Sequence, residues 1–192
     1  MVFVRPPYSQ HRAACLEGAP QLNFKAFGRN TLVGRIELSL YAAAPPDRCF
    51  DLARSVDAHI RSTAATRERA VGGKTSGLLE LGDEVTWRAR HFGVRQNLTS
   101  RIAAFDRPRH FRDSLVRGAF ARFDHDHYFA PESGGTRIRD VFDYRAPFGP
   151  VGWLAERLFL SAYMRRFLLA RLRELKTLAE SDAYVEFLPP AT

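Results

Sequence analysis

The sequence has few cysteines, few lysines and no long apolar segment. Its two cysteines, Cys15 and Cys49, are far apart and form no C-x-x-C pair, which excludes a disulfide-stapled secreted module and gives no zinc-finger spacing. The longest mainly apolar stretch, residues 151–164, contains Glu156 and Arg157 and is too short to cross a bilayer. We therefore expect a soluble, cytoplasmic protein with reduced thiols, no cofactor and no stable membrane insertion.

The composition is that of a globular protein with an excess of arginine. Of 192 residues, 45% are hydrophobic and 26% charged, which is typical of one domain built around a single core. The net charge is +8, and 26 of the 29 basic residues are arginine. Such an excess is common in proteins that bind nucleic acid or another anion. This interpretation depends on where the arginines lie.

The chain divides into an arm, a domain and a tail. Residues 1–32 lack periodicity and predict an irregular N-terminal arm, residues 33–181 form the domain, and residues 182–192 are a C-terminal tail. From residue 35 to 42 apolar and polar residues alternate, which predicts a strand. The following Pro-Pro-Asp at 45–47 stops the strand and opens a short helix. A second short helix is expected over residues 55–62.

The rest of the domain predicts a sheet followed by a long helix. Residues 66–145 are strand-like and are broken by turn residues, most of them glycines, into six strands. Connections this short join antiparallel strands. Residues 152–181 follow a helical period and would span about 45 Å. The order predicts an α+β fold: a curved antiparallel sheet of about seven strands wrapped around a long C-terminal helix, with two short helices after the first strand. We expect an apolar cavity between sheet and helix.

Alternation along the strands assigns their faces, because residues i and i+2 point the same way. The outer face carries most of the sheet's arginines, namely Arg88, Arg90, Arg101, Arg112, Arg122, Arg137 and Arg139. Acidic residues share that face, and no block of five basic residues occurs, so we expect no nucleic-acid binding. An anionic partner on the arginine-rich outer face remains an alternative function.

The apolar inner face carries five ionisable residues: His91, Asp113, His125, His127 and Asp140. Burying them without partners is costly. Histidine beside carboxylate is the pairing that acid–base catalysis uses. Four interpretations stay open: a satisfied buried network, a polar patch that orients a ligand, an acid–base set, or a metal held by His125, His127 and His91. No cysteine and no metalloprotease-type spacing supports the last, so we expect no metal.

These patterns predict the site residues. The candidates for catalysis are His91, Asp113, His125 and His127. The candidates for ligand binding are Trp87, His91, Asp113, His125, His127, Phe129, Asp140, Phe142, Tyr144, Phe159 and Tyr163.

Two other patterns predict no site. Gly73-Lys74-Thr75 resembles the end of a phosphate loop, but Glu68 stands where that loop needs its first glycine. Asp57 and His59 are two residues apart and diverge on a helix, so we expect a solvated helix end.

Several segments together resemble a known superfamily. They are Gly77–Gly93 (GLLELGDEVTWRARHFG), Leu98–Ile102, Phe111–Asp113, Gly118–Phe120 and His125–Phe129 (HDHYF). With the order of elements, they resemble the START-like or SRPBCC superfamily with the helix-grip fold of Bet v 1. Within it they resemble a polyketide cyclase/dehydrase-like bacterial branch of ligand-binding proteins. The resemblance covers residues 33–181 and leaves the arm unexplained.

The resemblance implies a cavity for a small hydrophobic molecule, and an epimerase-like partner by family analogy. The leading hypothesis is therefore binding of a hydrophobic or aromatic ligand, lipid- or polyketide-like. The alternative is a cyclase- or dehydratase-type enzyme that uses the His/Asp set in the same cavity. The identity of the ligand and the formation of a homo-oligomer are left open.

Overall fold

The computed structural model describes residues 34–91, 93–147 and 159–189. The predicted arm and the first part of the predicted long helix lie outside these residues.

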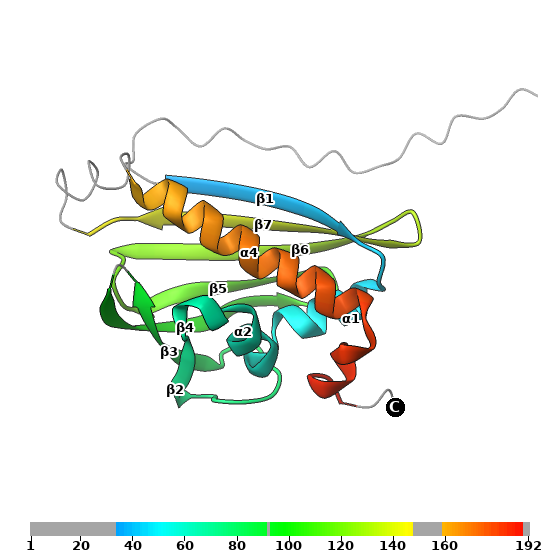
Figure 1. The fold of residues 1–192 in the computed structure, drawn as a ribbon, viewed down its shortest axis with the longest axis horizontal. Coiled ribbons are helices and arrows are strands. Elements are labelled where there is room, and N and C mark those ends of the chain that lie inside the picture. Colours follow the sequence, from blue (N-terminus) through cyan, green and yellow to red (C-terminus); the bar gives the residue numbers. More distant parts are fainter. Residues whose placement is uncertain (1–33, 92, 148–158, 190–192) are drawn as a thin grey trace, which may run out of the picture. The chain divides into compact units, whose positions relative to one another are not determined.

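Within the described residues, seven strands form one antiparallel sheet in the order β1-β7-β6-β5-β4-β3-β2 (Figure 1). From β2 to β7 each strand pairs with the next along the chain, and β1 pairs with β7. The strands are β1 (Gly34–Ala42), β2 (Arg69–Gly73), β3 (Glu84–His91), β4 (Val94–Asp106), β5 (His110–Arg117), β6 (Arg122–Glu132) and β7 (Gly135–Arg145). The predicted number of strands and their antiparallel pairing are confirmed.

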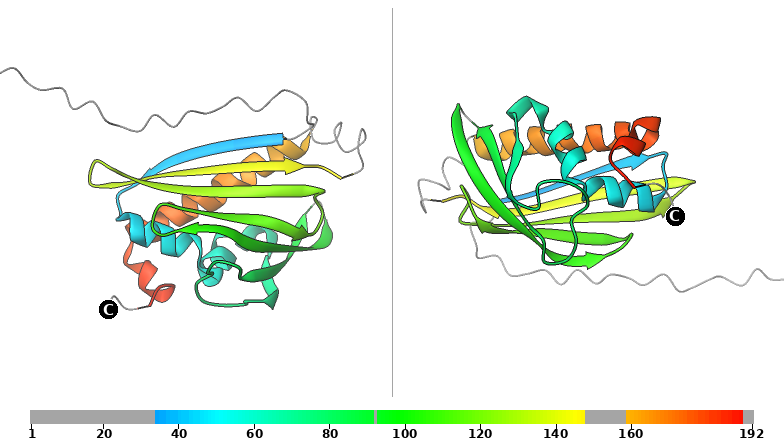
Figure 2. Two further views of the ribbon diagram at one scale, coloured as in Figure 1. Left: turned by 180° about the vertical axis from the view of Figure 1, so that it is seen from behind. Right: turned by 90° about the horizontal axis from the view of Figure 1, so that it is seen from below.

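The described helices lie on one face of this sheet (Figure 2). Helices α1 (Pro46–Ala53) and α2 (Val56–Ser62) follow β1, and α4 (Ser161–Glu180) runs along the sheet. The short 3₁₀ turns are η1 (Ala64–Thr66) and η3 (Asp182–Glu186). The architecture is the predicted helix-grip α+β fold. None of these helices has the length and hydrophobicity needed to span a lipid bilayer.

Local sequence signals explain where the two short helices begin. Pro46 occupies the first turn of α1, where a backbone N–H would have no partner within the helix, so its absence costs nothing. Asp47 lies in the same turn, and its negative charge interacts favourably with the positive end of the helix dipole. Ser55 caps α2, and its hydroxyl accepts a hydrogen bond from the Ala58 amide at 3.3 Å.

The core beneath α1 is built on Phe50. Its ring meets those of Phe105, Phe111 and Phe129 edge-on, at centroid distances of 5.3, 5.4 and 5.4 Å. Phe105 reaches this cluster because the register of β4 shifts between Ile102 and Ala104. Simple alternation would have placed Ala104 there, and an irregularity of this kind reverses the faces beyond it.

The outer face of the sheet, where alternation predicted arginines and acidic residues together, is lined with ion pairs. The pairs are Arg35–Asp143, Arg101–Glu84, Arg112–Asp126, Arg122–Asp124, Arg137–Glu132 and Arg139–Glu37. Much of the positive charge of the sheet is therefore balanced locally.

Candidate functional site

A cavity of about 420 Å³ lies between α4 and strands β3–β7. Its lining is mainly apolar and includes seven aromatic side chains. The sheet and its loops contribute Trp87, Phe120, Phe123 and Phe142, and Phe159, Tyr163 and Phe167 come from α4 and the turn before it. The predicted cavity between sheet and helix is therefore present.

One end of the cavity is polar because three ionisable side chains meet there: His59 from α2, Glu68 from the segment before β2, and Arg171 from α4. The His59 ring stacks on Trp87 at a centroid distance of 3.9 Å. Its Nε2 atom lies 3.4 Å from Glu68 Oε2. The solvated helix end predicted for His59 is thus wrong, because α2 packs its C-terminal half against β3.

The charges at this end follow from burial and proximity. Burial lowers the pKa of His59, and Arg171 lowers it further, which leaves the imidazole neutral near pH 7. Burial alone would raise the pKa of Glu68, but His59 and Arg171 outweigh it and hold that pKa below its ordinary value. Glu68 and Arg171 therefore offset one another's charge.

His91 ends β3 and also lines the cavity. Its Nδ1 atom lies 2.6 Å from the hydroxyl of Tyr163 on α4, and the two groups share a hydrogen bond. Burial lowers the pKa of His91 and raises that of Tyr163, so both are neutral near pH 7. This bond joins β3 to α4.

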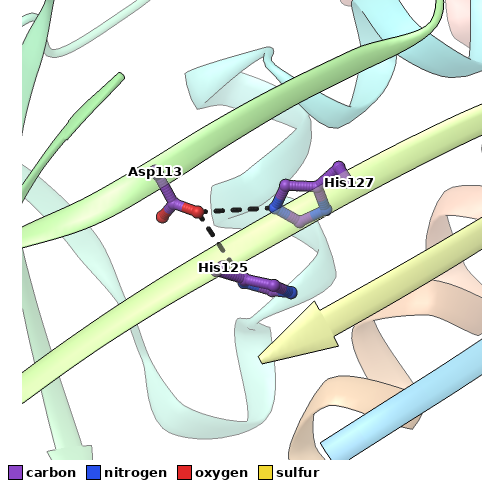
Figure 3. A group of neighbouring side chains, drawn as sticks. All are labelled: Asp113, His125 and His127. Carbon is purple, nitrogen blue, oxygen red and sulfur yellow. Dashed lines mark ion pairs between the residues drawn. The ribbon is translucent and has the colours of Figure 1, made fainter. Parts of the chain in front are cut away.

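The remaining predicted groups form one cluster on three adjacent strands. Strand pairing sets Asp113 opposite His125 and Asp140 opposite His127. Figure 3 shows the Asp113 carboxylate on β5 directed at both imidazole rings of β6. Asp113 Oδ1 lies 3.5 Å from His127 Nε2 and 3.8 Å from His125 Nδ1.

Asp140 contacts the same two rings from the other side. Its Oδ1 atom accepts a hydrogen bond of 2.8 Å from His127 Nδ1, and its Oδ2 atom lies 3.7 Å from His125 Nε2. The two histidines are therefore held between two carboxylates.

The pKa values in this cluster move in opposite directions. Burial alone would lower the pKa of His127, but Asp140 and Asp113 outweigh it and raise that pKa. Burial lowers the pKa of His125, and His127 lowers it further. Burial would raise the pKa of both carboxyl groups, yet the neighbouring histidines hold them below the usual range. The two neighbouring histidines therefore differ in proton affinity, which is higher at His127 and lower at His125.

Most of the predicted ligand-binding residues line the cavity. They are Trp87, His91, Asp113, His125, Phe142, Phe159 and Tyr163. His127 and Asp140 are buried and do not line this cavity. His127 borders a separate hollow of about 20 Å³.

Phe129 and Tyr144 do not reach the cavity, which corrects two predictions. Phe129 belongs to the core around Phe50, because α1 covers that part of β6. Tyr144 is fully buried, stacks on Phe142 and shares a hydrogen bond of 2.8 Å with the hydroxyl of Ser161. Both side chains face inward as predicted, but other elements cover them.

Sequence reasoning missed His59, Glu68 and Arg171 as site residues. A signal existed for Arg171: it continues the inward stripe of Tyr163 and Phe167 at intervals of four residues. A charged residue on the apolar side of a helix predicts a buried partner.

Comparison with protein families matches residues 34–180 to the family described as polyketide cyclase/dehydrase and lipid transport. No curated protein matches the chain.

Several solved structures share the fold at low sequence identity. The Zhui aromatase/cyclase from a Streptomyces species has a TM-score of 0.64 at 15% identity, and the match covers 77% of this chain and 94% of that one. TTHA0849 from Thermus thermophilus has a TM-score of 0.63 at 20% identity, covering 75% and 95%. Major latex-like protein 151 from Panax ginseng has a TM-score of 0.56 at 15% identity, covering 79% and 100%.

The structural likeness confirms the fold, and the family match spans more than half of the sequence. The chain therefore belongs to the polyketide cyclase/dehydrase and lipid transport family, as its resemblance to START-like proteins predicted.

Proposed function

We propose that the protein binds a small hydrophobic or aromatic molecule in the cavity between the sheet and α4. The observation that carries this proposal is a cavity of about 420 Å³ with a mainly apolar lining, seven aromatic side chains and one polar end. Its volume lies within the range of roughly 300–1,000 Å³ that small-molecule sites occupy. Its composition fits a ligand with an apolar body and a polar group at one end.

The polar end distinguishes this cavity from an unfilled core. His59, Glu68 and Asp113 all border it, and each has a polar atom buried without a hydrogen-bond partner, as does His125. Unpartnered buried polar atoms are costly. A ligand with a hydroxyl or carbonyl group would satisfy some of them, which supports a specific orientation of the bound molecule.

The direct experiment is native mass spectrometry of the purified full chain, followed by solvent extraction. A second measurement uses Trp87, which lines the cavity. The variant Trp153→Phe leaves Trp87 as the only tryptophan, and titration with anilinonaphthalene sulfonate should quench its emission.

A matched pair of variants decides whether the probe enters the cavity. Ala89→Phe places a ring in the cavity wall, whereas Val94→Phe adds the same ring at a position 60% exposed on the next strand. We expect Ala89→Phe to weaken probe binding at least about tenfold and Val94→Phe to leave it unchanged. Equal affinity in both variants would contradict binding in the cavity.

A cyclase or dehydratase activity is the second candidate, supported by the position of Asp113 and His125 on the cavity wall. These two are the members of the cluster that a bound molecule would touch. If a polyketide-like substrate turns over, His125→Gln should reduce turnover by roughly 100-fold. Unchanged turnover would leave His125 as a ligand-orienting group.

An anionic partner is the third candidate, and one arginine cluster supports it. Arg67, Arg69, Arg88, Arg90 and Arg95 line an outer groove of about 320 Å³. Among the described residues none of them forms an ion pair with a carboxylate, in contrast to the arginines further along the sheet. Affinity for heparin that falls steeply with salt and is lost in Arg88→Ala/Arg90→Ala would support this function. Binding that is absent or independent of salt would exclude it.

A further inference from the structure

The cluster on β5 and β6 has the donor atoms of a metal centre. Asp113, His125 and His127 each offer one donor atom, and these three atoms lie within 4.8 Å of one another. Imidazole nitrogens and a carboxylate oxygen are ligands that divalent transition metals take in proteins. Of the three residues only Asp113 is partly exposed, and His125 and His127 are buried.

The distances agree with coordination of a single ion. Metal–ligand bonds of about 2.1 Å at tetrahedral angles place neighbouring donor atoms about 3.4 Å apart. The carboxylate oxygen lies 3.5 Å from one histidine nitrogen and 3.8 Å from the other. Both separations are too long for a good hydrogen bond. The two carboxylate–histidine separations therefore lie within about 0.4 Å of the spacing expected around a shared ion.

Two polar atoms of this group lack partners in the described structure. Asp113 Oδ1 and His125 Nε2 are buried and accept or donate no hydrogen bond. Buried polar atoms in folded proteins are nearly always satisfied. The unpartnered carboxylate oxygen is the atom on which the two histidine nitrogens converge, and an ion would satisfy it.

Asp140 supplies the support that metal-binding histidines require. It accepts a hydrogen bond from His127 Nδ1 at 2.8 Å. Because a carboxylate only accepts, Nδ1 must carry a proton, so Nε2, which faces Asp113, is the nitrogen available to bind an ion. A carboxylate behind the ligating ring in this way is a regular feature of zinc sites.

The charge balance also favours a cation. Histidines that bind a metal are neutral, and Asp113 and Asp140 then leave two negative charges in the cluster. Arg171 is the nearby positive charge, and Glu68 lies close enough to Arg171 to offset it. The cluster therefore retains a net negative charge that a divalent ion would neutralise.

The site has room for an ion and remains open to the cavity. Asp113 and His127 border the hollow of about 20 Å³, which is enough for one water-sized occupant. Asp113 and His125 also border the main cavity. Three protein ligands with one open position is the arrangement of catalytic rather than structural zinc sites.

We propose that Asp113, His125 and His127 bind a divalent transition-metal ion, with Zn²⁺ the ion that best fits the ligand set. Asp140 acts as the positioning residue for His127, and the open coordination position faces the cavity. The site replaces the His91-containing set considered from the sequence, because His91 is bonded to Tyr163 instead.

Titration of the untagged, chelator-treated full chain with zinc sulfate in a calorimeter tests the proposal without any organic ligand. We expect one Zn²⁺ per chain. Asp113→Asn and His125→Gln should weaken binding by at least about 100-fold, and Asp140→Asn by about 10–100-fold. The matched control is His110→Gln, which removes a histidine from the outer face of β5 and should leave affinity unchanged.

Replacement by Co²⁺ gives a readout that does not depend on the variants folding. A cobalt ion bound by two nitrogens and an oxygen in a four-coordinate site has an intense visible d–d absorption. No such absorption in the wild-type chain would overturn the proposal, as would equal zinc affinity in Asp113→Asn and His110→Gln. Loss of zinc binding in Asp113→Asn with unchanged probe binding would separate the metal site from the proposed ligand cavity.

Discussion

Strands β5 and β6 carry histidine and aspartate on both faces, and the two faces differ in how these groups are satisfied. On the outer face Asp126 accepts hydrogen bonds from His110 at 2.7 Å and from Arg112 at 2.8 and 2.9 Å. On the inner face, the Asp113 oxygen stands 3.5 and 3.8 Å from its two histidines. Similar residue types thus form a closed ion-pair network on one side and an incompletely bonded cluster on the other.

This difference indicates which groups stabilise the fold and which are available to a ligand. Groups whose hydrogen bonds are complete have nothing left to offer a bound molecule. Groups that are buried and incompletely bonded lower stability unless a ligand or ion completes them. Substitutions on the two faces should therefore have different consequences.

The largest effect is expected from Asp140→Ala on the inner side of β7. Asp140 is buried and is the main group that raises the pKa of His127. Its removal therefore leaves a buried histidine without its main counter-charge. Breaking a buried pair in this way costs about 3–5 kcal/mol. Urea denaturation at neutral pH measures the loss. A change under about 1 kcal/mol would show that the inner cluster does not stabilise the fold.

A smaller, pH-dependent effect is expected from Asp126→Asn on the outer face. Burial would raise the pKa of Asp126, but His110 and Arg112 outweigh it and lower it to about 2. A depressed folded-state pKa stabilises the protein above the unfolded pKa of about 4, and the contribution disappears as pH falls toward 2. The variant should lose up to about 2 kcal/mol at pH 7, less to the extent that exposed Arg112 is screened.

Urea denaturation of wild type and Asp126→Asn at pH 7, 5 and 3 tests whether this stabilisation is lost as the pH falls. The difference in unfolding free energy should be similar at pH 7 and 5 and should shrink at pH 3. A difference that stays constant to pH 3 would contradict the role assigned to the ionised carboxylate.

The smallest effect is expected from the Arg35–Asp143 pair, which joins β1 to β7 on the outer face. Its nitrogen and oxygen lie 2.9 Å apart, but the side chains are 50% and 32% exposed. Exposed pairs contribute about 0–1 kcal/mol. A double-mutant cycle with Arg35→Ala and Asp143→Ala should give a coupling energy within that range, and 0.5 M salt should reduce it. A coupling above about 2 kcal/mol would remove the distinction between exposed and buried pairs.

The face of the sheet on which each strand residue lies could be predicted from the sequence, because side chains alternate along a strand with a fixed period of two. His125, His127 and Asp140 point inward on regular strands, and the alternation needs no knowledge of neighbouring elements. The method failed at the register shift after Ile102, where Phe105 rather than Ala104 joins the core.

Depth and partners depend on tertiary packing, and periodicity contains no information on them. Phe129 and Phe142 are equivalent by alternation, yet α1 covers the first and the cavity exposes the second. His59 and Glu68 come from α2 and the segment before β2, outside the regular part of the sheet, and meet only when α2 packs against β3. The family resemblance implied a cavity, but it did not indicate that His59, Glu68 and Arg171 form a polar end.

The place of α4 in the chain has a consequence for how the protein folds. Helix α4 follows all seven strands, and none of the cavity residues lies on β1. Strands β2 to β7 pair with neighbours in the chain and form local hairpins, so they are the elements expected to assemble early. Until α4 docks, the part of their inner face that borders the cavity lacks the helix that covers it. We therefore expect a stage during synthesis at which the future binding surface is exposed, and a ligand present at that stage would be covered when the helix docks.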